Sequence, residues 1–249
     1  MLKINNITKS YANGGGGSAN SRFFAIKDIS FTVERGELFG IVGLSGSGKT
    51  TLLRTILQLT NPDSGSVLFR NSELTDLDEE ALREEVRPRL RKVYQHPEAS
   101  LNPGLQVAKI ISQPIALYNP RMNKNELEQQ TEWILQQVGL PLVYKTKYPF
   151  QLSGGEKRRV ALARAIATKP EVLFADEPFA GLDKALQYRM LKLLMDIKRE
   201  RNLTIVMVSH DIDVIRHVCD RIMTLKGGQI ADIKEAGSNG VPVNMDHFR

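Results

Sequence analysis

GLSGSGKT, residues 43–50, is the stretch that decides the fold, because it fits the phosphate-loop pattern of glycine, four residues, glycine-lysine and serine or threonine. Glycines let successive backbone N–H groups converge on phosphate oxygens, and a following helix turns its positive end toward the same anion. Lys49 would neutralise terminal phosphate charge and the Thr50 hydroxyl would ligate Mg²⁺. The stretch predicts a nucleotide site formed by Gly43, Ser45, Gly46, Ser47, Gly48, Lys49, Thr50 and the adjoining Thr51.

The segments around this loop alternate between strand and helix. LFGIVG (38–43) is a short apolar run that suits a strand buried on both faces, and TTLLRTILQL (50–59) has helical periodicity. EVLFAD (171–176) and LTIVMVS (203–209) are two further buried strands. Between them, residues 183–200 predict a helix capped by Asp183. Alternating strands and helices predict a parallel α/β core.

Two other regions differ from this core. β-Branched and aromatic residues alternate with polar ones in LKINNI (2–7) and ISFTV (29–33), which predicts N-terminal strands. NGGGGSANS (13–21) is too rich in Gly and Ser to pack and predicts either a natural flexible surface loop or an engineered linker. VAKIISQPIALY (107–118) and NELEQQTEWILQQVGL (125–140) show helical spacing, the second with apolar residues inward at Leu127, Trp133 or Ile134, and Val138.

We therefore predict the α/β class, with a P-loop NTPase (RecA-like) core, an N-terminal antiparallel β subdomain and an inserted α-helical subdomain. The predicted organisation is one domain over residues 1–249, with the core at 1–95 and 165–249 and the helical subdomain at 96–164.

Composition and charge limit the class of protein and its expected location. Of 249 residues, 41% are hydrophobic and 25% charged, as in ordinary globular proteins. No apolar run approaches the roughly 18 residues of a membrane span, and MLKINNITKS lacks the apolar core of a signal peptide, so we expect a cytoplasmic chain. The net charge of +6 favours acidic partners without choosing among them. Two groups of cations predict solvated helix faces: Arg83, Arg87, Arg89, Arg91 and Lys92, and Lys157, Arg158, Arg159 and Arg164.

Polar residues at strand ends supply candidates for catalysis. Asp176 and Glu177 end an apolar strand, where one carboxylate can hold Mg²⁺ and the other can polarise a water that attacks the γ-phosphate. Gln95 closes the strand KVYQ and can coordinate Mg²⁺ or that water as a neutral amide. His210 follows another strand and could meet the γ-phosphate, although a lone histidine there is usually a turn residue.

A second anion-binding device lies about one hundred residues from the first. LSGGE (152–156) opens a basic helix, and Ser153, Gly154 and Gly155 would leave N–H groups exposed at its N-terminus. Either both devices fold onto one nucleotide, or each serves a nucleotide held by a different subunit.

Together these residues resemble the ABC ATPase family. Residues 43–50, Gln95, LSGGE, the Asp176-Glu177 pair and His210 occur in that family's order. The resemblance implies ATP and Mg²⁺ as cofactors and a head-to-tail dimer, in which ATP lies between the phosphate loop of one subunit and Ser153, Gly154, Gly155 and Glu156 of the other. It also implies that Tyr11 stacks on adenine.

Within the family, QHPEASLNP (95–103) and ADEPFAGLDKALQ (175–187) are similar to segments of ATP-binding subunits of peptide and nickel importers. His96 and Gly181 depart from that pattern. The resemblance leaves the transported substrate open, because the ATPase subunit does not touch it. The resemblance implies ATP hydrolysis that powers import of peptide, nickel or a similar small solute. Implied partners are a second ATPase subunit, transmembrane permeases and a substrate-binding protein, and the implied location is the cytoplasmic face of the membrane.

Two alternatives belong to other functional classes. A soluble ABC-type ATPase acting on DNA is disfavoured because Lys49 and Ser153 are too close in sequence for a long coiled coil, and we expect no nucleic acid partner. One acting on ribosomes is disfavoured because such members usually hold two cassettes in one chain, and this sequence has one. A switch that binds nucleotide without hydrolysis is disfavoured because every catalytic position is filled.

Overall fold

The computed structural model describes residues 1–12, 22–94 and 100–236. The chain divides into two compact units. Unit 1 consists of Met1–Val86 and the segment that begins at Thr204, and unit 2 consists of Arg87–Leu203. The Gly-rich segment 13–21 lies outside the described residues.

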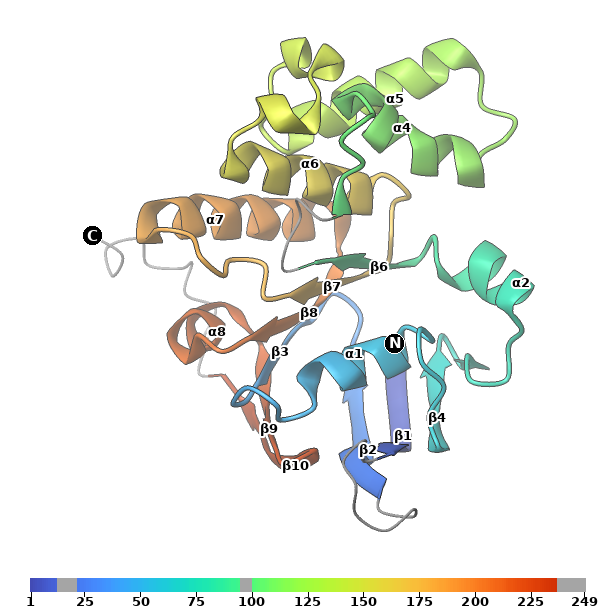
Figure 1. Ribbon diagram of the computed structural model, residues 1–249, viewed down its shortest axis with the longest axis vertical. Coiled ribbons are helices and arrows are strands. Elements are labelled where there is room, and N and C mark those ends of the chain that lie inside the picture. Colours follow the sequence, from blue (N-terminus) through green and yellow to red (C-terminus); the bar gives the residue numbers. More distant parts are fainter. Residues whose placement is uncertain (13–21, 95–99, 237–249) are drawn as a thin grey trace. The chain divides into compact units, whose positions relative to one another are not determined.

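Unit 1 contains an antiparallel sheet in the order β2-β1-β4-β5. Its strands are β1 (Leu2–Ala12), β2 (Arg22–Val33), β4 (Ser64–Phe69) and β5 (Ser72–Glu73). Strand β1 has buried and exposed positions along its length. Leu2, Ile4 and Ile7 are buried while Lys3 and Asn6 face solvent, which accounts for the mixture of apolar and polar residues in this stretch of the sequence. Figure 1 shows β1, β2 and β4 side by side. Two short helical segments follow β5, α2 (Glu79–Ala81) and a π-helical turn at Leu82–Val86.

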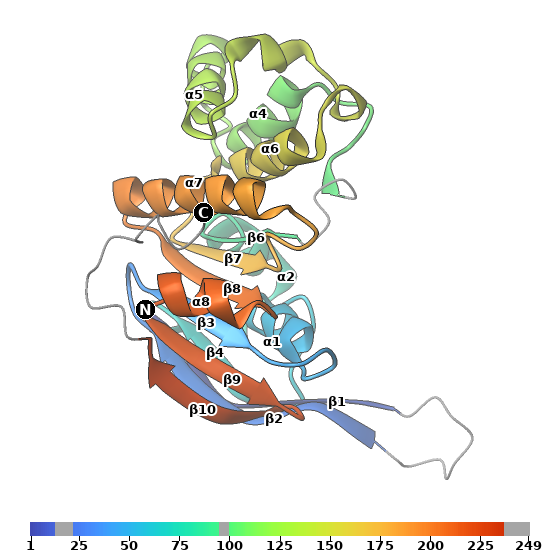
Figure 2. The ribbon, with the colours of Figure 1, turned by 90° about the vertical axis from the view of Figure 1, so that its left-hand side faces the viewer.

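The second sheet portion of unit 1 carries the phosphate loop. β3 (Leu38–Val42) pairs in parallel with β8 (Thr204–Ser209) and β9 (Arg221–Lys226), and β10 (Gln229–Glu235) pairs antiparallel with β9 (Figure 2). Every residue of β3 and β8 is buried, as expected for strands covered on both faces. Val42 lies opposite Ser209 in the register, so the segments that follow these two strands leave the sheet at the same edge. The helices of this portion are α1 (Lys49–Ile56) and α8 (Ile212–Val218).

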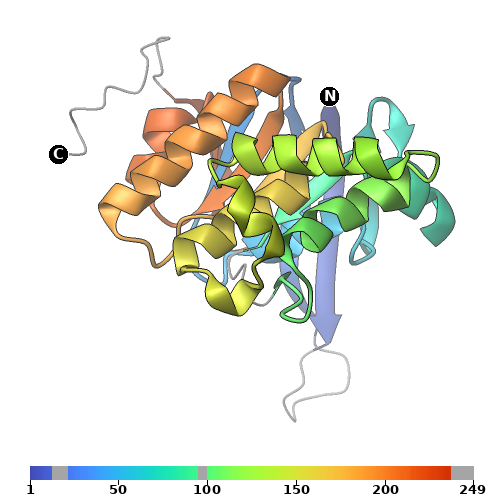
Figure 3. The same cartoon turned by 90° about the horizontal axis from the view of Figure 1, so that it is seen from above.

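Unit 2 contains the parallel pair β6 (Leu90–Val93) and β7 (Val172–Asp176), with Val93 opposite Ala175. Its helices are α4 (Val107–Tyr118), α5 (Lys124–Gln137), α6 (Gly154–Ile166) and α7 (Lys184–Arg201). Figure 3 shows α4, α5 and α6 in green to yellow, and α4 packs against both α5 and α6. Two 3-10 turns, Leu142–Thr146 and Pro149–Gln151, lead into α6.

Several predicted elements are confirmed and some details are wrong. The helix predicted over 107–118 is α4 itself, and Asp183 caps α7 by accepting from the Leu186 N–H at 2.8 Å. The helix predicted to end at residue 59 stops at Ile56, because Gln58 takes a left-handed φ of 53° and its side chain donates to the Thr55 carbonyl at 2.9 Å.

The burial of α5 decides between two predicted inward residues. Ile134 is buried, whereas the Trp133 ring is 44% exposed and lies under the Arg201 guanidinium, 4.7 Å from its centroid. The prediction of solvated faces for the basic groups is wrong for Lys92, whose side chain is 8% exposed. It is also wrong for Arg158, which is bonded to two carbonyl oxygens. In the described part of the chain, we find no helix that is both long and apolar enough to cross a membrane.

Candidate functional site

The phosphate loop of unit 1 has a backbone that only glycine can supply at two positions. Gly48 has a φ of 102°, and a Cβ there would lie 2.3 Å from the Ala25 carbonyl oxygen. At Gly43 a Cβ would lie 2.3 Å from the Leu225 carbonyl oxygen and 2.6 Å from Ser47 Oγ. The glycines of the pattern are therefore needed for the packing of the loop as well as for its curvature.

Lys49, the first residue of α1, folds back over this loop. Its Nζ donates to the Gly43 carbonyl at 2.7 Å, to the Leu44 carbonyl at 2.9 Å and to Ser47 Oγ at 3.4 Å. The Lys49 ammonium group thus lies against the loop, where terminal phosphates are bound in proteins of this pattern. The first turn of α1 has no acidic side chain that would repel an anion, so this helix N-terminus suits a negatively charged ligand.

His210 and the phosphate loop line the same cleft in unit 1. His210 follows β8, and Asp211 caps α8 by accepting from the Val214 N–H at 3.2 Å. The structure thus brings together two features predicted separately. The cleft is lined by loop residues Gly43, Leu44, Ser45, Gly46 and Ser47, by His210 and Arg216, and by Thr224, Lys226, Asp232 and Lys234 of the β9–β10 hairpin.

Three other predicted nucleotide residues also lie in unit 1. Tyr11 lies near the end of β1 with its ring 42% exposed, and Lys9 Nζ lies 5.7 Å from the ring centroid. Thr50 and Thr51 lie in the first turn of α1, and Thr50 is exposed. An exposed aromatic ring and an exposed hydroxyl are accessible to a ligand, which fits the predicted roles of Tyr11 and Thr50.

Asp176 and Glu177 lie at the carboxyl end of β7 in unit 2. Asp176 is buried, and its Oδ2 lies 2.7 Å from the Nζ of Lys92 on β6. Its carboxylate oxygens suit Mg²⁺, a cation that prefers hard oxygen ligands, but one of them is in contact with an ammonium group. Glu177 has a φ of 47°, a conformation that non-glycine residues rarely adopt and that occurs often at active sites.

The LSGGE segment forms the N-terminus of α6 in unit 2. Ser153 caps the helix, with its N–H donating to Glu156 Oε2 at 2.8 Å and its Oγ accepting from the Glu156 N–H at 3.4 Å. Tyr144 donates its hydroxyl proton to Glu156 Oε1, and this hydrogen bond lowers the pKa of Glu156 and raises that of Tyr144. Ser153 and Gly154 are exposed, and a Cβ on Gly154 would contact nothing within 4 Å, so this terminus is accessible to another molecule.

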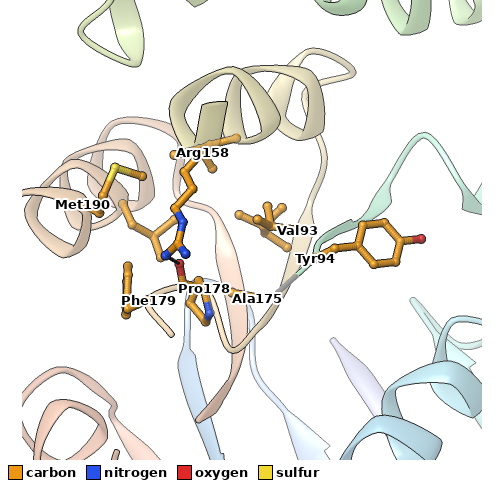
Figure 4. Close-up of a pocket in the computed structure, with 10 residues that line it drawn as sticks. Val93, Tyr94, Arg158, Ala175, Pro178, Phe179 and Met190 are labelled. Carbon is orange, nitrogen blue, oxygen red and sulfur yellow. Dashed lines mark hydrogen bonds between the residues drawn. The ribbon is translucent and has the colours of Figure 1, made fainter. Parts of the chain in front are cut away.

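Arg158 connects α6 to the loop that follows β7. Its Nη1 donates to the Pro178 carbonyl at 3.4 Å and its Nη2 to the Ala180 carbonyl at 2.7 Å. Figure 4 shows its guanidinium directed at Pro178, beside Phe179 and Met190. A separate cleft of unit 2 is lined by Ser153, Gly154, Gly155, Glu156, Arg158 and Arg159 of the α6 region and by Gly181, Leu182, Asp183 and Leu186.

Sequence reasoning missed three of these contacts. It placed Asp176 and Glu156 in the site but gave no partner to either, and it gave Arg158 only a solvated position. Each contact joins residues that are separated in the sequence. The separation is 84 positions for Lys92 and Asp176, 12 for Tyr144 and Glu156, and 20 for Arg158 and Pro178. β6 reads LRKV, with two adjacent cations, and its sequence does not single out Lys92 as the one that reaches Asp176. Gln95 lies outside the described residues.

Comparison with known proteins gives one family. Residues 26–180, more than half of the chain, match the family model described as ABC transporter. Among curated relatives, the oligopeptide transport ATP-binding protein AppF of Bacillus subtilis is 37% identical over 84% of this chain and 63% of its own length. The methionine import ATP-binding protein MetN of Cupriavidus metallidurans is 38% identical over 93% of this chain and 64% of its own length. This chain thus spans less than two thirds of those relatives.

A solved structure is similar along nearly the whole chain. The dimeric post-hydrolysis state of the ATP-binding cassette MJ0796, bound to ADP and Pi, has a TM-score of 0.84 and 32% sequence identity, and the match covers 95% of this chain and 99% of that one. With both sheets and the helical segments present, the predicted fold class is confirmed. The family match over more than half of the residues leads to one conclusion: the chain belongs to the ABC transporter family.

Proposed function

We propose that the chain is an ATP-hydrolysing subunit that powers import across a membrane and completes its sites with a second ATPase subunit. The observation that carries this proposal is the phosphate loop, with Lys49 Nζ 2.7 Å from the Gly43 carbonyl and a backbone at Gly48 that excludes other residues. Support also comes from the solved ABC cassette that contains ADP and Pi.

Residues of unit 1 bind the nucleotide in this proposal. Backbone N–H groups of residues 43–48 and the Lys49 ammonium bind the phosphates, with Ser45, Ser47 and Thr51 completing the loop. Tyr11 stacks on the adenine, and His210 contacts the γ-phosphate from the far side of the shared cleft. The exposure of the Tyr11 ring supports its role.

Residues of unit 2 supply the catalytic carboxylates. Glu177 orients the attacking water, and the Asp176 carboxylate would be a ligand of Mg²⁺. The Thr50 hydroxyl keeps its predicted role as a ligand of Mg²⁺. When bound, Mg²⁺ neutralises charge that develops on the β- and γ-phosphate oxygens. Gln95, as an uncharged amide, would contact Mg²⁺ or the water. We also propose that residues 96–164 act as a helical subdomain and that 1–95 and 165–249 form the core.

The N-terminus of α6 serves a nucleotide held by the partner subunit. Ser153 and Gly154 are exposed, and the Glu156 carboxylate is already engaged by Tyr144 and Ser153, so the free helix end presents N–H groups to an incoming phosphate. The dimeric structure of the similar cassette supports this arrangement.

The proposed cargo is a peptide or a similar small solute. AppF of Bacillus subtilis and OppF of Streptococcus mutans are named as oligopeptide transport ATP-binding proteins, and MetN is named for methionine import. Further proposed partners are transmembrane permease subunits and a substrate-binding protein, with the chain at the cytoplasmic face of the membrane. No relative named here supports nickel.

A mixing experiment tests the proposal. Lys49→Ala removes the phosphate-binding ammonium and Ser153→Arg blocks the N-terminus of α6, so we expect each variant alone to be inactive. In a mixed dimer, the intact loop of the Ser153→Arg chain faces the intact α6 of the Lys49→Ala chain, and ATPase activity should return at up to half the wild-type value. Absence of rescue in mixtures shown to form dimers would contradict the shared site. Wild-type activity that stays proportional to concentration down to a demonstrated monomer would also refute it.

A further inference from the structure

We infer that Lys92 occupies the Asp176 carboxylate and competes with Mg²⁺ for it, so that this chain binds the metal more weakly than its metal-ligating residues alone would allow. The inference rests on the proposed function, because that function assigns Mg²⁺ to Asp176.

The sheet register brings the two side chains together. In the parallel pair β6–β7, Lys92 lies opposite Phe174, and Asp176 is two residues further along the same strand. Residues two apart on a strand point to the same face, so Lys92, Phe174 and Asp176 share one face of this pair. The long lysine side chain spans the offset and places Nζ 2.7 Å from Asp176 Oδ2.

Burial makes this contact stronger than a surface ion pair. The side chains of Lys92 and Asp176 are 8% and 11% exposed. A buried charge is costly unless it is paired, so removal of either side chain would leave the other charge buried without a counter-charge. Most surface ion pairs lack this mutual dependence.

A divalent cation must displace or approach this ammonium group. Mg²⁺ needs a carboxylate oxygen at about 2.0–2.1 Å. With Lys92 in place, the metal would lie within a few ångströms of a positive charge at low local dielectric, where repulsion is strong. Metal binding at Asp176 is therefore weakened for as long as the Lys92 ammonium group stays on Oδ2.

The Lys92 ammonium group has a second contact besides Asp176. Its Nζ lies 4.9 Å from the centroid of the Tyr94 ring, and that ring is 45% exposed. An ammonium group over an aromatic face is stabilised by the ring quadrupole. The contact with Tyr94 does not depend on Asp176, so in this inference it stabilises the ammonium group when Mg²⁺ takes the carboxylate.

The test measures how strongly Mg²⁺ and ATP reinforce each other's binding. The full-length chain is titrated calorimetrically with ATP, once in EDTA and once in excess Mg²⁺, in a Glu177→Gln background that prevents turnover. The ratio of the two dissociation constants reports the coupling between metal and nucleotide. Lys92→Met should raise this ratio about tenfold or more through a lower dissociation constant in Mg²⁺, with the EDTA value changed less than threefold.

Three further variants make the result specific. Lys92→Arg keeps the ion pair and should leave the ratio within twofold of the parent. Arg89→Met removes a cation whose carboxylate partner is Glu171, at 3.9 Å, and should also leave it unchanged. In an Asp176→Asn background, Lys92→Met should change the ratio less than twofold, because the contested carboxylate is gone.

Thermal unfolding gives a readout that does not depend on nucleotide. In EDTA, Lys92→Met should melt below the parent, because Asp176 is left buried without a cation, and added Mg²⁺ alone should raise its melting temperature more than it raises the parent's. A ratio unchanged by Lys92→Met, with ATP binding intact, overturns the inference alone. A change confined to the ATP dissociation constant in EDTA also overturns it. In that case Lys92 would act on the ATP phosphates and not on the metal. Failure of the parent chain to bind ATP overturns the proposed function and the inference with it.

Discussion

Nη2 of Arg158, in the first turns of α6, donates to the carbonyl oxygen of Ala180 at 2.7 Å, in the loop that follows Glu177. The helix that presents Ser153 and the loop that begins at the proposed catalytic carboxylate are therefore joined by a side chain. A charged donor to a backbone carbonyl contributes about 1.5–3 kcal/mol.

Removal of that donor should affect both stability and turnover. We expect Arg158→Met to lower the free energy of unfolding by about 2 kcal/mol, because two carbonyl oxygens lose their donor. ATP binding should remain within about threefold, since the phosphate loop is untouched, while kcat should fall more than tenfold. Calorimetric melting and steady-state kinetics check these values. Arg189→Met, an exposed change on α7, is the control, and an equal loss of kcat in both variants would contradict the specific role of Arg158.

Two substitutions at Glu177 separate its chemistry from its backbone. Glu177→Gln should retain ATP binding and lose turnover by a factor of at least about 100, because an amide cannot accept the proton of the attacking water. Glu177→Gly should also lose turnover but should melt higher than Glu177→Gln, since glycine adopts a φ of 47° with about 1 kcal/mol less strain. Melting curves and single-turnover hydrolysis measure both effects. If the glycine variant proves the less stable of the two, the Glu177 backbone is not strained.

The Lys49 ammonium should dominate nucleotide affinity. Lys49→Ala removes three hydrogen bonds to the loop and the charge that faces the phosphates, so we expect ATP affinity to fall about 100-fold or more. Equilibrium binding of a fluorescent ATP analogue measures the change. Arg54→Ala removes an exposed charge from the same helix and should alter affinity less than twofold. Similar affinity in both variants would exclude Lys49 from the phosphate site.

Asp63 makes part of the free energy of unfolding depend on pH. Ser10 Oγ and N–H and the Lys9 ammonium donate to its carboxylate at 2.5, 2.8 and 3.1 Å, and the Ser10 hydroxyl is the main cause of a pKa lowered to about 2. A lowered folded-state pKa adds stability that is complete above the unfolded value, near 4, and is lost as the pH falls toward about 2.

Asp63→Asn should therefore melt below the wild type at neutral pH, and the difference should shrink as the pH falls from about 4. We expect a difference of about 1–2 kcal/mol at pH 7, allowing for a side chain that is 25% exposed. Urea unfolding at several pH values gives the curve. The exposed change Asp76→Asn is the comparison, and a pH-independent difference at Asp63 would mean that its charge does not contribute.

Local patterns were sufficient for much of the fold. Helix α4 could be predicted over residues 107–118 because the spacing of its apolar residues is a local pattern. The Asp183 cap was equally visible, since a capping side chain acts on an N–H three residues away. The loop at 43–50 was identified because its function requires a fixed order of residue types.

Contacts between distant segments could not be predicted in the same way. The Lys92–Asp176 ion pair depends on the register of two strands that are 84 positions apart, and periodicity within either strand does not specify that register. The choice between Trp133 and Ile134 depended on the angle at which α5 packs. The positive φ of Glu177 carries no sequence signal, because glutamate is uncommon in that conformation.

The hydrogen bonds from Lys49 to the carbonyls of Gly43 and Leu44 have a kinetic consequence. They close the loop before any ligand arrives, so the chain loses the conformational entropy of these residues during folding and not during association. The oxygens of an incoming triphosphate then replace the Gly43 and Leu44 carbonyls as hydrogen-bond acceptors of the Lys49 ammonium group. Its association rate should be set by diffusion and charge attraction, with no slow ordering step visible in rapid-mixing experiments.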